Sequence, residues 1–310
     1  MKSILNFDHF SLSFSKQVPV VDDISFSVET GKITALVGES GSGKSVSAMS
    51  VLRLLENANH VSYQGGIQFD GQNILALTNK QLRSIRGNDI GFIFQEPMMS
   101  LNPLHRIEKQ IAETLLIHQG LSINQSRPKI IEWLNKVGIR DAQTRLKDFP
   151  HQFSGGEQQR IMIAMALINE PKLLIADEPT TALDVTIQAQ IIELLISLKE
   201  TLNLTILFIT HDLSVVKRIA DKVVVMQKGK IVEQGNTNDV FNYPTQQYTQ
   251  TLINTRLTDS VFDIKKKQDT LIHCDEFNVW YPIKKGMFQK KRHGKTKKKD
   301  SHTLCSCSKD

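Results

Sequence analysis

Lys32-Ile-Thr-Ala-Leu-Val-Gly38-Glu-Ser-Gly-Ser-Gly43-Lys44-Ser45 is the stretch of sequence that decides the fold. Its first part, 32–37, is a short apolar run of the kind that forms a buried strand. The turn after it fits the pattern G-x-x-x-x-G-K-[ST], and a helix is predicted from Lys44 to about Leu55. Strand, glycine-rich loop and helix in this order open a phosphate-binding α/β unit, so we predict an α/β fold.

Each residue type in this loop suits the binding of phosphate. Glycines let successive backbone N–H groups turn inward around phosphate oxygens, at the positive end of the helix that follows. Lys44 is placed to reach the β- and γ-phosphates, and Ser45 to put a hydroxyl on Mg²⁺. An ordinary glycine-rich turn is the alternative, which the flanking strand and helix disfavour. The predicted nucleotide-binding residues of the loop are Gly38, Glu39, Ser40, Gly41, Ser42, Gly43, Lys44 and Ser45.

A second apolar run, Leu173–Ala176, ends in two adjacent carboxylates, Asp177 and Glu178. Asp177 is placed to hold Mg²⁺. Glu178 lies one residue further, where a carboxylate can polarise an attacking water as general base. Alone, such an ending is usually only a strand that meets solvent. Together with the phosphate loop it indicates hydrolysis of a nucleotide.

The stretch Ser154-Gly155-Gly156-Glu157 fits the Ser-x-x-Glu capping box and predicts a helix from Gly155 onward. The simpler interpretation is a good N-cap and nothing more. However, each glycine in a helix costs about 1 kcal/mol relative to alanine. Two glycines directly after the cap are explained if a ligand approaches the backbone N–H groups closely, and a phosphate held by another subunit is the candidate.

The order of the other predicted elements places a helical block inside a strand-rich core. Alternation of Phe10, Leu12 and Phe14 with polar residues predicts short strands in the first thirty residues. Helices alone are predicted between about Pro97 and Ala166, at Ile107–His118, at Arg127–Val137 and from Gly155 onward. Buried strands are predicted again at Leu173–Ala176, Thr205–Ile209 and Val223–Met226, and a long helix at Ile187–Leu202.

Taken together, these motifs resemble the ATP-binding cassette (ABC) family over about residues 4–255. The shared features, in the order and spacing of that family, are Gly38–Ser45, Phe94-Gln95-Glu96-Pro97, Phe153–Gln158, Asp177-Glu178, Thr181-Ala182-Leu183-Asp184 and His211. The resemblance implies a P-loop NTPase of the α/β class with a RecA-like core, an N-terminal antiparallel β part and an inserted helical subdomain. It implies one ATP-binding domain at 1–260, with the helical subdomain at about 97–166.

The resemblance also implies roles for single residues. Phe14 would stack on adenine, Gln95 would touch Mg²⁺ and the attacking water, and His211 would contact the γ-phosphate. A lone histidine after a strand is more often structural, but its place in Ile209-Thr210-His211-Asp212 favours the functional role. Asp184 would report to the opposite site across a dimer. In this family two cassettes pack head to tail. ATP at one phosphate loop would therefore be completed by residues of the other chain, namely Ser154, Gly155, Gly156 and Glu157.

Two further stretches, Gln95–Pro103 and Asp239–Leu252, are similar to importers of peptides and nickel. The resemblance implies an ATPase, with ATP and Mg²⁺ as cofactors, that powers import of peptides or related solutes, nickel being the alternative. It implies three partners: a second cassette of the same or another chain, integral membrane permease subunits and, indirectly, a substrate-binding protein. The expected location is the cytoplasmic face of the inner membrane, where the protein is peripheral.

Charge and composition exclude several other classes of protein. The net charge of +6 belongs to the tail, because residues 261–310 hold 13 Lys/Arg against 6 Asp/Glu. A basic face in the fold is therefore not expected, and neither is a nucleic-acid partner. No run approaches the ~18–20 apolar residues of a membrane-spanning helix, and the first residues lack a secretory signal pattern. ABC ATPases that act in DNA repair or on ribosomes remain a rival class, and a non-functional remnant is a third interpretation.

The tail, 261–310, is predicted to be a basic, disordered segment that contains all three cysteines, so no disulfide framework is expected. Its stretch 273–281 is similar to 6–14, and Phe277–Phe288 resembles the start of a second cassette. Our hypothesis is a tandem, two-cassette protein cut short, by a frameshift after about Lys291. A lysine-rich segment that binds anionic lipid is the alternative.

Overall fold

The computed structural model describes residues 2–15, 18–56, 60–95, 100–181, 183–257, 280–283 and 292–295. The chain divides into two compact units, Met1–Thr258 and Asp259–Asp310, and each is described by itself. In the second unit, strand β11 (Trp280–Ile283) pairs antiparallel with β12 (Arg292–Lys295). The rest of the predicted tail, including its three cysteines, lies outside the described residues.

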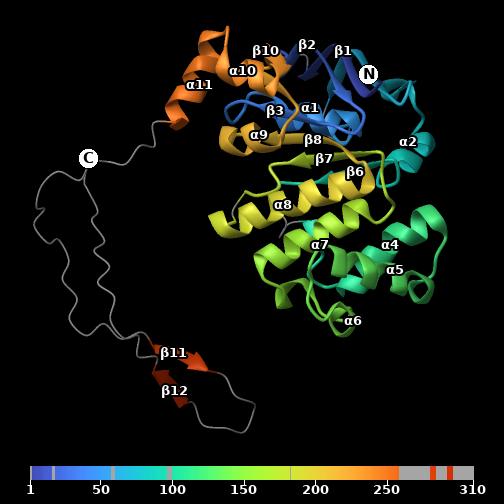
Figure 1. Ribbon diagram of the computed structural model, residues 1–310. Helices are drawn as coiled ribbons and strands as arrows, with labels where there is room; N and C mark the ends of the chain where they lie inside the picture. The colour runs from blue at the N-terminus through green and yellow to red at the C-terminus, as the bar shows by residue number, and fades with distance from the viewer. Residues whose placement is uncertain are drawn as a thin grey trace, which may run out of the picture. The chain divides into compact units, whose positions relative to one another are not determined.

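A six-stranded sheet with the order β10-β9-β3-β8-β7-β6 is the centre of the first unit (Figure 1). Its strands are β3 (Ile33–Val37), β6 (Ile90–Ile93), β7 (Leu173–Asp177), β8 (Thr205–Thr210), β9 (Lys222–Gln227) and β10 (Lys230–Asn236). All neighbours pair in parallel except β10, which pairs antiparallel with β9. The four buried strands predicted from apolar runs are confirmed. Every residue of β3, β7 and β8 is buried, as expected for a parallel sheet covered on both faces.

The N-terminal part forms a separate antiparallel sheet with the order β2-β1-β4-β5. Its strands are β1 (Ser3–Phe14), β2 (Val21–Glu29), β4 (Val61–Phe69) and β5 (Gln72–Asn73). The predicted alternation is confirmed, but β1 is a single strand of 12 residues rather than short strands. An irregularity at His9 interrupts its register. Opposite it, Gly65 is required, because a Cβ there would lie 2.0 Å from the His9 carbonyl oxygen.

Alternate residues of the six-stranded sheet belong to different cores, because side chains alternate between the two faces of a strand. Leu173 and Ile175 pack with the N-terminal sheet and the first helix. Leu174 and Ala176 pack with the helical block. A third, smaller core at β3 and β9 includes Val37 and residues of the C-terminal helices. The sheet is thus held from both sides, which fixes the positions of its strand ends.

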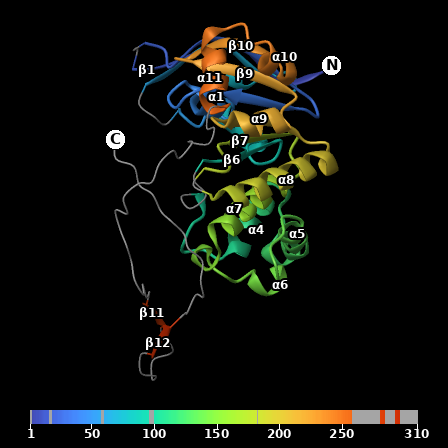
Figure 2. The ribbon, with the colours of Figure 1, turned by 60° about the vertical axis from the view of Figure 1, so that its left-hand side comes forward.

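The helices cover the six-stranded sheet and form a block at one end of the unit (Figures 1 and 2). The helices are α1 (Lys44–Val51), α2 (Asn79–Ile85), α4 (Ile107–Gln119), α5 (Ile123–Lys136), α6 (Ala142–Arg145), α7 (Gly155–Leu167), α8 (Val185–Leu202), α9 (Leu213–Ile219), α10 (Thr237–Asn242) and α11 (Gln247–Leu257). Between 100 and 166 all the regular structure is helical, as predicted. Within the described residues, no helix is long and apolar enough to cross a membrane.

Two helix ends differ from the prediction for identifiable reasons. Helix α1 ends at Val51 rather than near Leu55. The guanidinium of Arg86 donates to the Leu52 carbonyl oxygen at 2.8 Å, and Arg53 adopts the left-handed conformation with φ 50°, which stops the helix. Helix α5 begins at Ile123, four residues before the predicted start, because Ser122 caps it.

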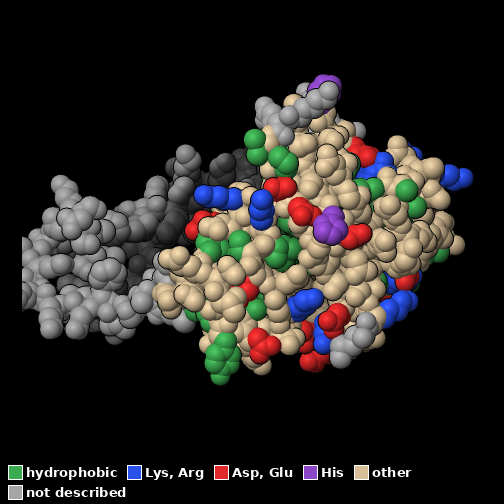
Figure 3. Space-filling model, turned by 90° about the horizontal axis from the view of Figure 1, so that it is seen from above, with side chains coloured by type: hydrophobic (Ala, Val, Ile, Leu, Met, Phe, Trp, Pro, Cys, Tyr) green, Lys and Arg blue, Asp and Glu red, His purple; other side chains and the backbone are tan. Residues whose placement is uncertain are grey.

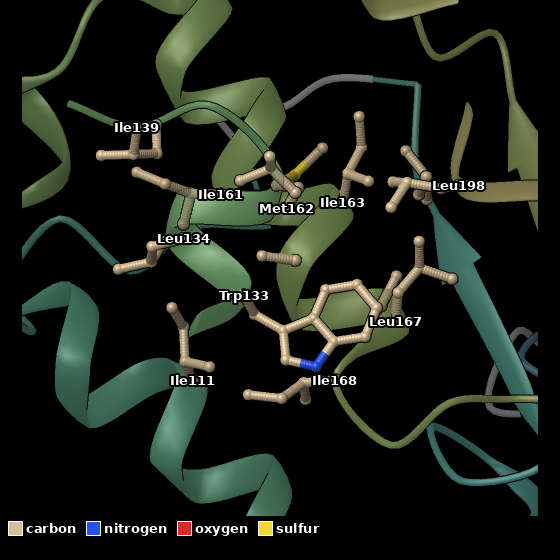
Figure 4. Packing of buried hydrophobic residues seen from close by; sticks show 14 of the residues in the cluster. Ile111, Trp133, Leu134, Ile139, Ile161, Met162, Ile163, Leu167, Ile168 and Leu198 are labelled. Carbon is tan, nitrogen blue, oxygen red and sulfur yellow. The ribbon is translucent and has the colours of Figure 1, made fainter. Parts of the chain in front are cut away.

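Trp133 on α5 is the largest fully buried side chain of the helical block, only 1% exposed (Figure 4). Around it Figure 4 shows Ile111, Leu167 and Ile168, which come from two other helical segments. The indole therefore joins α4, α5 and α7, and the start of α7 carries the predicted Ser154-Gly155-Gly156 segment. Packing at Trp133 is thus part of what fixes that segment.

Trp133→Ala is expected to lower the free energy of unfolding by about 3–5 kcal/mol, because it leaves a large cavity in a close-packed core. Urea or guanidinium denaturation of the purified chain measures this change. Ile117→Ala, on the same block but with the side chain 66% exposed, is the matched control and should change stability by less than about 0.5 kcal/mol. Equal effects of the two substitutions would contradict the role assigned to Trp133.

Candidate nucleotide-binding site

The predicted site residues follow four neighbouring strands at one edge of the parallel sheet. The phosphate loop follows β3, Gln95 follows β6, Asp177 ends β7, and His211 follows β8. In the register of the sheet, Val37 is opposite Thr210, and Asp177 is opposite Ile209. The carboxyl ends of parallel strands are where open α/β sheets bind ligands. The sheet therefore brings together residues that are far apart in the sequence.

The phosphate loop between β3 and α1 needs glycine at both of its ends. Gly38 has φ 152°, and a Cβ there would lie 2.2 Å from the Met226 carbonyl oxygen. Gly43, at the N-cap of α1, has φ 99°. The side chain of Lys44, the first residue of α1, folds back over the loop, and its ammonium donates to the carbonyl oxygens of Gly38 and Glu39 at 2.9 and 2.8 Å. The loop is thus a closed turn around a buried cation, and burial lowers the pKa of Lys44.

Ser45 and Asp177 provide a pair of oxygen atoms beside this loop. The Ser45 hydroxyl donates to Asp177 Oδ1 at 2.9 Å. Burial raises the pKa of the Asp177 carboxyl to about 6, although the Ser45 hydrogen bond and the Lys44 charge act in the opposite direction. A hydroxyl and a carboxylate at this separation are ligands suited to Mg²⁺, which prefers oxygen donors. Burial disfavours the carboxylate charge, which a bound cation would stabilise.

The Glu178 carboxylate is held by three side chains. Gln95 Nε2 donates to Oε2 at 3.2 Å, the Thr181 hydroxyl donates to Oε2 at 2.9 Å, and His211 Nδ1 lies 3.1 Å from Oε1. Glu178 itself has φ 43°, a left-handed conformation that costs a non-glycine residue about 1–3 kcal/mol. A strained backbone that aims a restrained carboxylate is typical of a functional position. Gln95 and His211, predicted to touch the attacking water and the γ-phosphate respectively, both contact this carboxylate, while those predicted roles stay predictions.

Beside Glu178 lies a cavity of about 270 Å³. It is lined by Glu178, Thr180, Thr181, Leu183, Gln188, Thr210, His211 and Asp212. Its walls come from the turn after β7, the start of α8 and the turn after β8. The carboxylate predicted to act as general base therefore faces a space that admits water or part of a ligand.

The Ser154-Gly155-Gly156-Glu157 segment opens α7 as predicted. Ser154 Oγ accepts from the Glu157 N–H, and the Glu157 carboxylate accepts from the Ser154 N–H at 2.9 Å. Arg145 donates to the Glu157 carboxylate and lies 4.0 Å above the ring of Phe153. Among the described residues, the side chains of this segment form hydrogen bonds within the start of α7 and with Arg145 at the end of α6, and these bonds do not join the segment to the phosphate loop of the same chain.

The predicted roles of Phe14 and Asp184 stay predictions. Phe14 ends β1, opposite Val61, and is partly buried. Asp184 caps α8, and its carboxylate accepts from the Ile187 N–H at 3.0 Å. The sequence interpretation missed three contacts: Thr181 with Glu178, Arg145 with Glu157, and Tyr248 with the loop. Thr181 belongs to a recognised motif, so its hydroxyl could have been considered.

Figure 3 shows one face of the molecule, on which basic and acidic side chains are interspersed rather than separated. Single-sign patches of Lys and Arg are the usual mark of nucleic-acid binding.

Within the described residues, no three His, Cys, Asp or Glu side chains form a metal-binding group. A cation at Ser45 and Asp177 would take its remaining ligands from phosphate, water and Gln95, the third residue predicted to touch it.

Comparison with known proteins gives a consistent result. The family profile described as "ABC transporter" matches residues 21–181. The chain is 52% identical to "Peptidoglycan transport ATP-binding protein YejF" of Agrobacterium fabrum, and the match covers 87% of this chain. It spans about half, 50%, of the length of that relative. It is 46% identical to "Dipeptide transport ATP-binding protein DppD" of Escherichia coli, covering 81% of this chain and 77% of the relative.

A solved structure shows the same fold. The ATP-binding cassette MJ0796, in a dimeric post-hydrolysis state bound to ADP and Pi, superposes with a TM-score of 0.64. The match covers 75% of this chain and 98% of that one, with 26% sequence identity. The cassette fold with its antiparallel N-terminal sheet, expected from the sequence motifs, is therefore confirmed.

Asp177→Asn is expected to stabilise the nucleotide-free protein above pH 6 by up to about 3 kcal/mol, the value of a pKa rise from 3.8 to about 6. The native carboxyl holds its proton longer than the unfolded one, so wild-type stability falls as pH rises from about 4 to 6 and stays lower above it. The variant has no carboxyl at this position and therefore does not lose stability in this way as the pH rises. Melting temperatures of both proteins at pH 4.5 and pH 8, without Mg²⁺, measure the difference.

The exposed carboxyl of Asp8 supplies the matched control, Asp8→Asn, for this experiment. Its melting temperature at pH 8 should stay close to that of the wild type. A melting temperature of Asp177→Asn that is no higher than that of the wild type at pH 8 would contradict the cost assigned to the buried charge.

Proposed function

The chain belongs to the ABC transporter family of ATP-binding proteins, and on this premise we propose that it hydrolyses ATP to power import across a membrane. The observation that carries the proposal is the Glu178 carboxylate, which is oriented by Gln95, Thr181 and His211 at the edge of the sheet that carries the phosphate loop. An ordinary strand end would not restrain a carboxylate with three side chains in a strained backbone conformation.

In the proposed reaction, the loop Gly38–Ser45 holds the phosphates through its backbone N–H groups at the start of α1. Lys44 leaves its carbonyl partners to contact the β- and γ-phosphates. Ser45 and Asp177, together with Gln95, would hold Mg²⁺, which would neutralise charge on the transferred phosphoryl group. Phe14 would stack on the adenine.

Water is the proposed acceptor of the γ-phosphoryl group. Glu178 accepts a proton from the attacking water, and the amide of Gln95 orients this carboxylate. His211, which contacts the opposite oxygen of Glu178, would contact the γ-phosphate. Catalysis then depends mainly on positioning and on stabilisation of charge rather than on covalent chemistry.

The site is completed by a second cassette. Two observations support this part of the proposal: the capped start of α7 is bonded within its own lobe, and a structural relative is a dimer with ADP and Pi. In a head-to-tail dimer, Ser154, Gly155, Gly156 and Glu157 of one chain approach the γ-phosphate held by the other, and Asp184 lies at the dimer contact. ATP then favours the closed dimer, and hydrolysis releases it.

The proposed cargo is a peptide or a related solute. The names of the two curated relatives support it, since one refers to dipeptide and the other to peptidoglycan transport. The proposed partners are integral membrane permease subunits and, indirectly, a substrate-binding protein. We place the chain peripherally on the cytoplasmic face of the membrane, where permease subunits would anchor it.

ATP hydrolysis measured over a series of protein concentrations tests the proposed function. For a homodimer, activity should rise faster than linearly with concentration. Glu178→Gln should lower kcat by about 10²–10⁴-fold, the contribution of a general base, while ATP binding is retained. Glu132→Gln, an exposed glutamate on α5 paired with Lys136, is the matched control and should leave kcat unchanged.

Other outcomes of this series of protein concentrations also have a defined meaning. Wild-type protein that binds ATP without turnover at any concentration would identify the partner as a different cassette. Absence of ATP binding, or full activity of Glu178→Gln, would contradict the proposed function.

Mixing two inactive variants tests whether the site is shared between chains. Lys44→Ala removes the phosphate contact, and Gly155→Asp places a carboxylate where the phosphate should arrive; a Cβ at Gly155 meets only Leu183, at 3.8 Å. In a homodimer with two sites, a mixed dimer has one doubly altered site and one intact site. Steady-state hydrolysis of an equal mixture should return to about a quarter of wild-type activity, because about half of the dimers are mixed. Sites contained in single chains would give no recovery.

A further inference from the structure

Helix α11, which Figure 1 shows beside α10, contributes to the core that contains the end of β3, the strand that leads into the phosphate loop. Ile253 on α11 is buried in the same core as Val37, the last residue of β3, and Leu252 packs beside it. Together with Val225 these residues line a small apolar space between helix and sheet. A helix near the end of the unit therefore shares its packing with the residue that directly precedes Gly38.

The start of α11 is fixed by one carboxylate. Glu233 on β10 accepts from the Thr245 N–H at 2.8 Å, from the Thr245 hydroxyl at 2.9 Å and from the Gln246 N–H at 3.3 Å. A negative group at this end suits the helix dipole. These hydrogen bonds lower the pKa of Glu233, although its partial burial acts in the opposite direction. The start of the helix is thereby held beside β10.

Tyr248, in the first turn of α11, contacts the phosphate loop. Its hydroxyl oxygen accepts a hydrogen bond from the Glu39 N–H at 3.2 Å, across 209 positions of sequence. The Tyr248 ring packs against the core that contains Val37. Burial raises the pKa of the phenol, so the hydroxyl stays neutral at physiological pH.

The peptide groups on the two sides of Glu39 are thus restrained by different parts of the molecule. Tyr248 receives the Glu39 N–H, whereas the Glu39 carbonyl oxygen accepts from Lys44 Nζ at 2.8 Å and from the Ser42 N–H at 3.2 Å. Lys44 must exchange its contacts with carbonyl oxygens for contacts with phosphate when nucleotide binds. The contact from Tyr248 does not involve Lys44 and can keep the first turn of the loop in place during this exchange.

We propose that Tyr248 is a positioning residue that pre-organises the phosphate loop and so couples the docking of α11 to nucleotide binding. The inference rests on the proposed function, since it requires the loop to bind nucleotide. A loop already fixed in its binding conformation loses less conformational freedom when ligand binds, so affinity rises. The coupling is reciprocal: nucleotide must stabilise the docked position of α11 by the same factor.

Tyr248→Phe tests this role, because it keeps the ring and removes the acceptor of the Glu39 N–H. We expect the Kd for Mg–ADP, measured by calorimetry on the full chain, to rise about 2- to 10-fold, the range for one neutral hydrogen bond. The melting temperature of the nucleotide-free protein should change little. Tyr243→Phe, at a tyrosine that is 79% exposed just before α11, is the matched control and should alter neither quantity.

Hydrogen exchange of the α11 amides separates positioning from general support of the fold. In the wild type, Mg–ADP should slow exchange in α11, and in Tyr248→Phe this slowing should be lost. An unchanged Kd and unchanged slowing in the variant would overturn the inference while leaving the proposed function intact. A weaker Kd accompanied by a large fall in melting temperature, with the slowing retained, would also overturn it. Wild-type protein that binds no Mg–ADP would instead contradict the proposed function.

Discussion

The parallel register of β3, β8, β7 and β6 is the constraint on which the rest of the structure depends. Parallel strands must be joined by crossovers, so residues at neighbouring strand ends come from distant parts of the chain. The register places the phosphate loop, Asp177 and His211 at one edge. Apolar packing on both faces of the sheet then fixes that edge, because a slip by one residue would turn the buried side chains to the opposite face.

Burial at this edge determines the electrostatics of the site. The same low-dielectric surroundings that raise the pKa of Asp177 lower the pKa of Lys44, so both charged forms carry a desolvation cost. A divalent cation and a polyphosphate bound together would offset both costs.

Local chemistry made the site largely predictable from the sequence, and distant contacts made the rest unpredictable. The loop from Gly38 to Ser45 and the Asp177-Glu178 pair carry their chemistry in neighbouring residues. The early end of α1 depends on Arg86, which reaches the Leu52 carbonyl oxygen from another element. The Tyr248 contact with Glu39 joins segments that no local pattern relates. The earlier start of α5 could have been predicted from the capping pair Ser122 and Gln125, which the sequence analysis did not recognise.

The start of α7 indicates how hydrolysis can be made conditional on a partner. A free carboxylate at Glu157 would repel an approaching phosphate, but Arg145 and the Ser154 N–H already hold it. What remains to attract an anion is the positive end of the helix and the N–H groups next to two glycines, which have no side chains to obstruct approach. In the proposed dimer, this surface would approach a phosphate already held by the loop of another cassette, and association of the two cassettes would then be linked to hydrolysis.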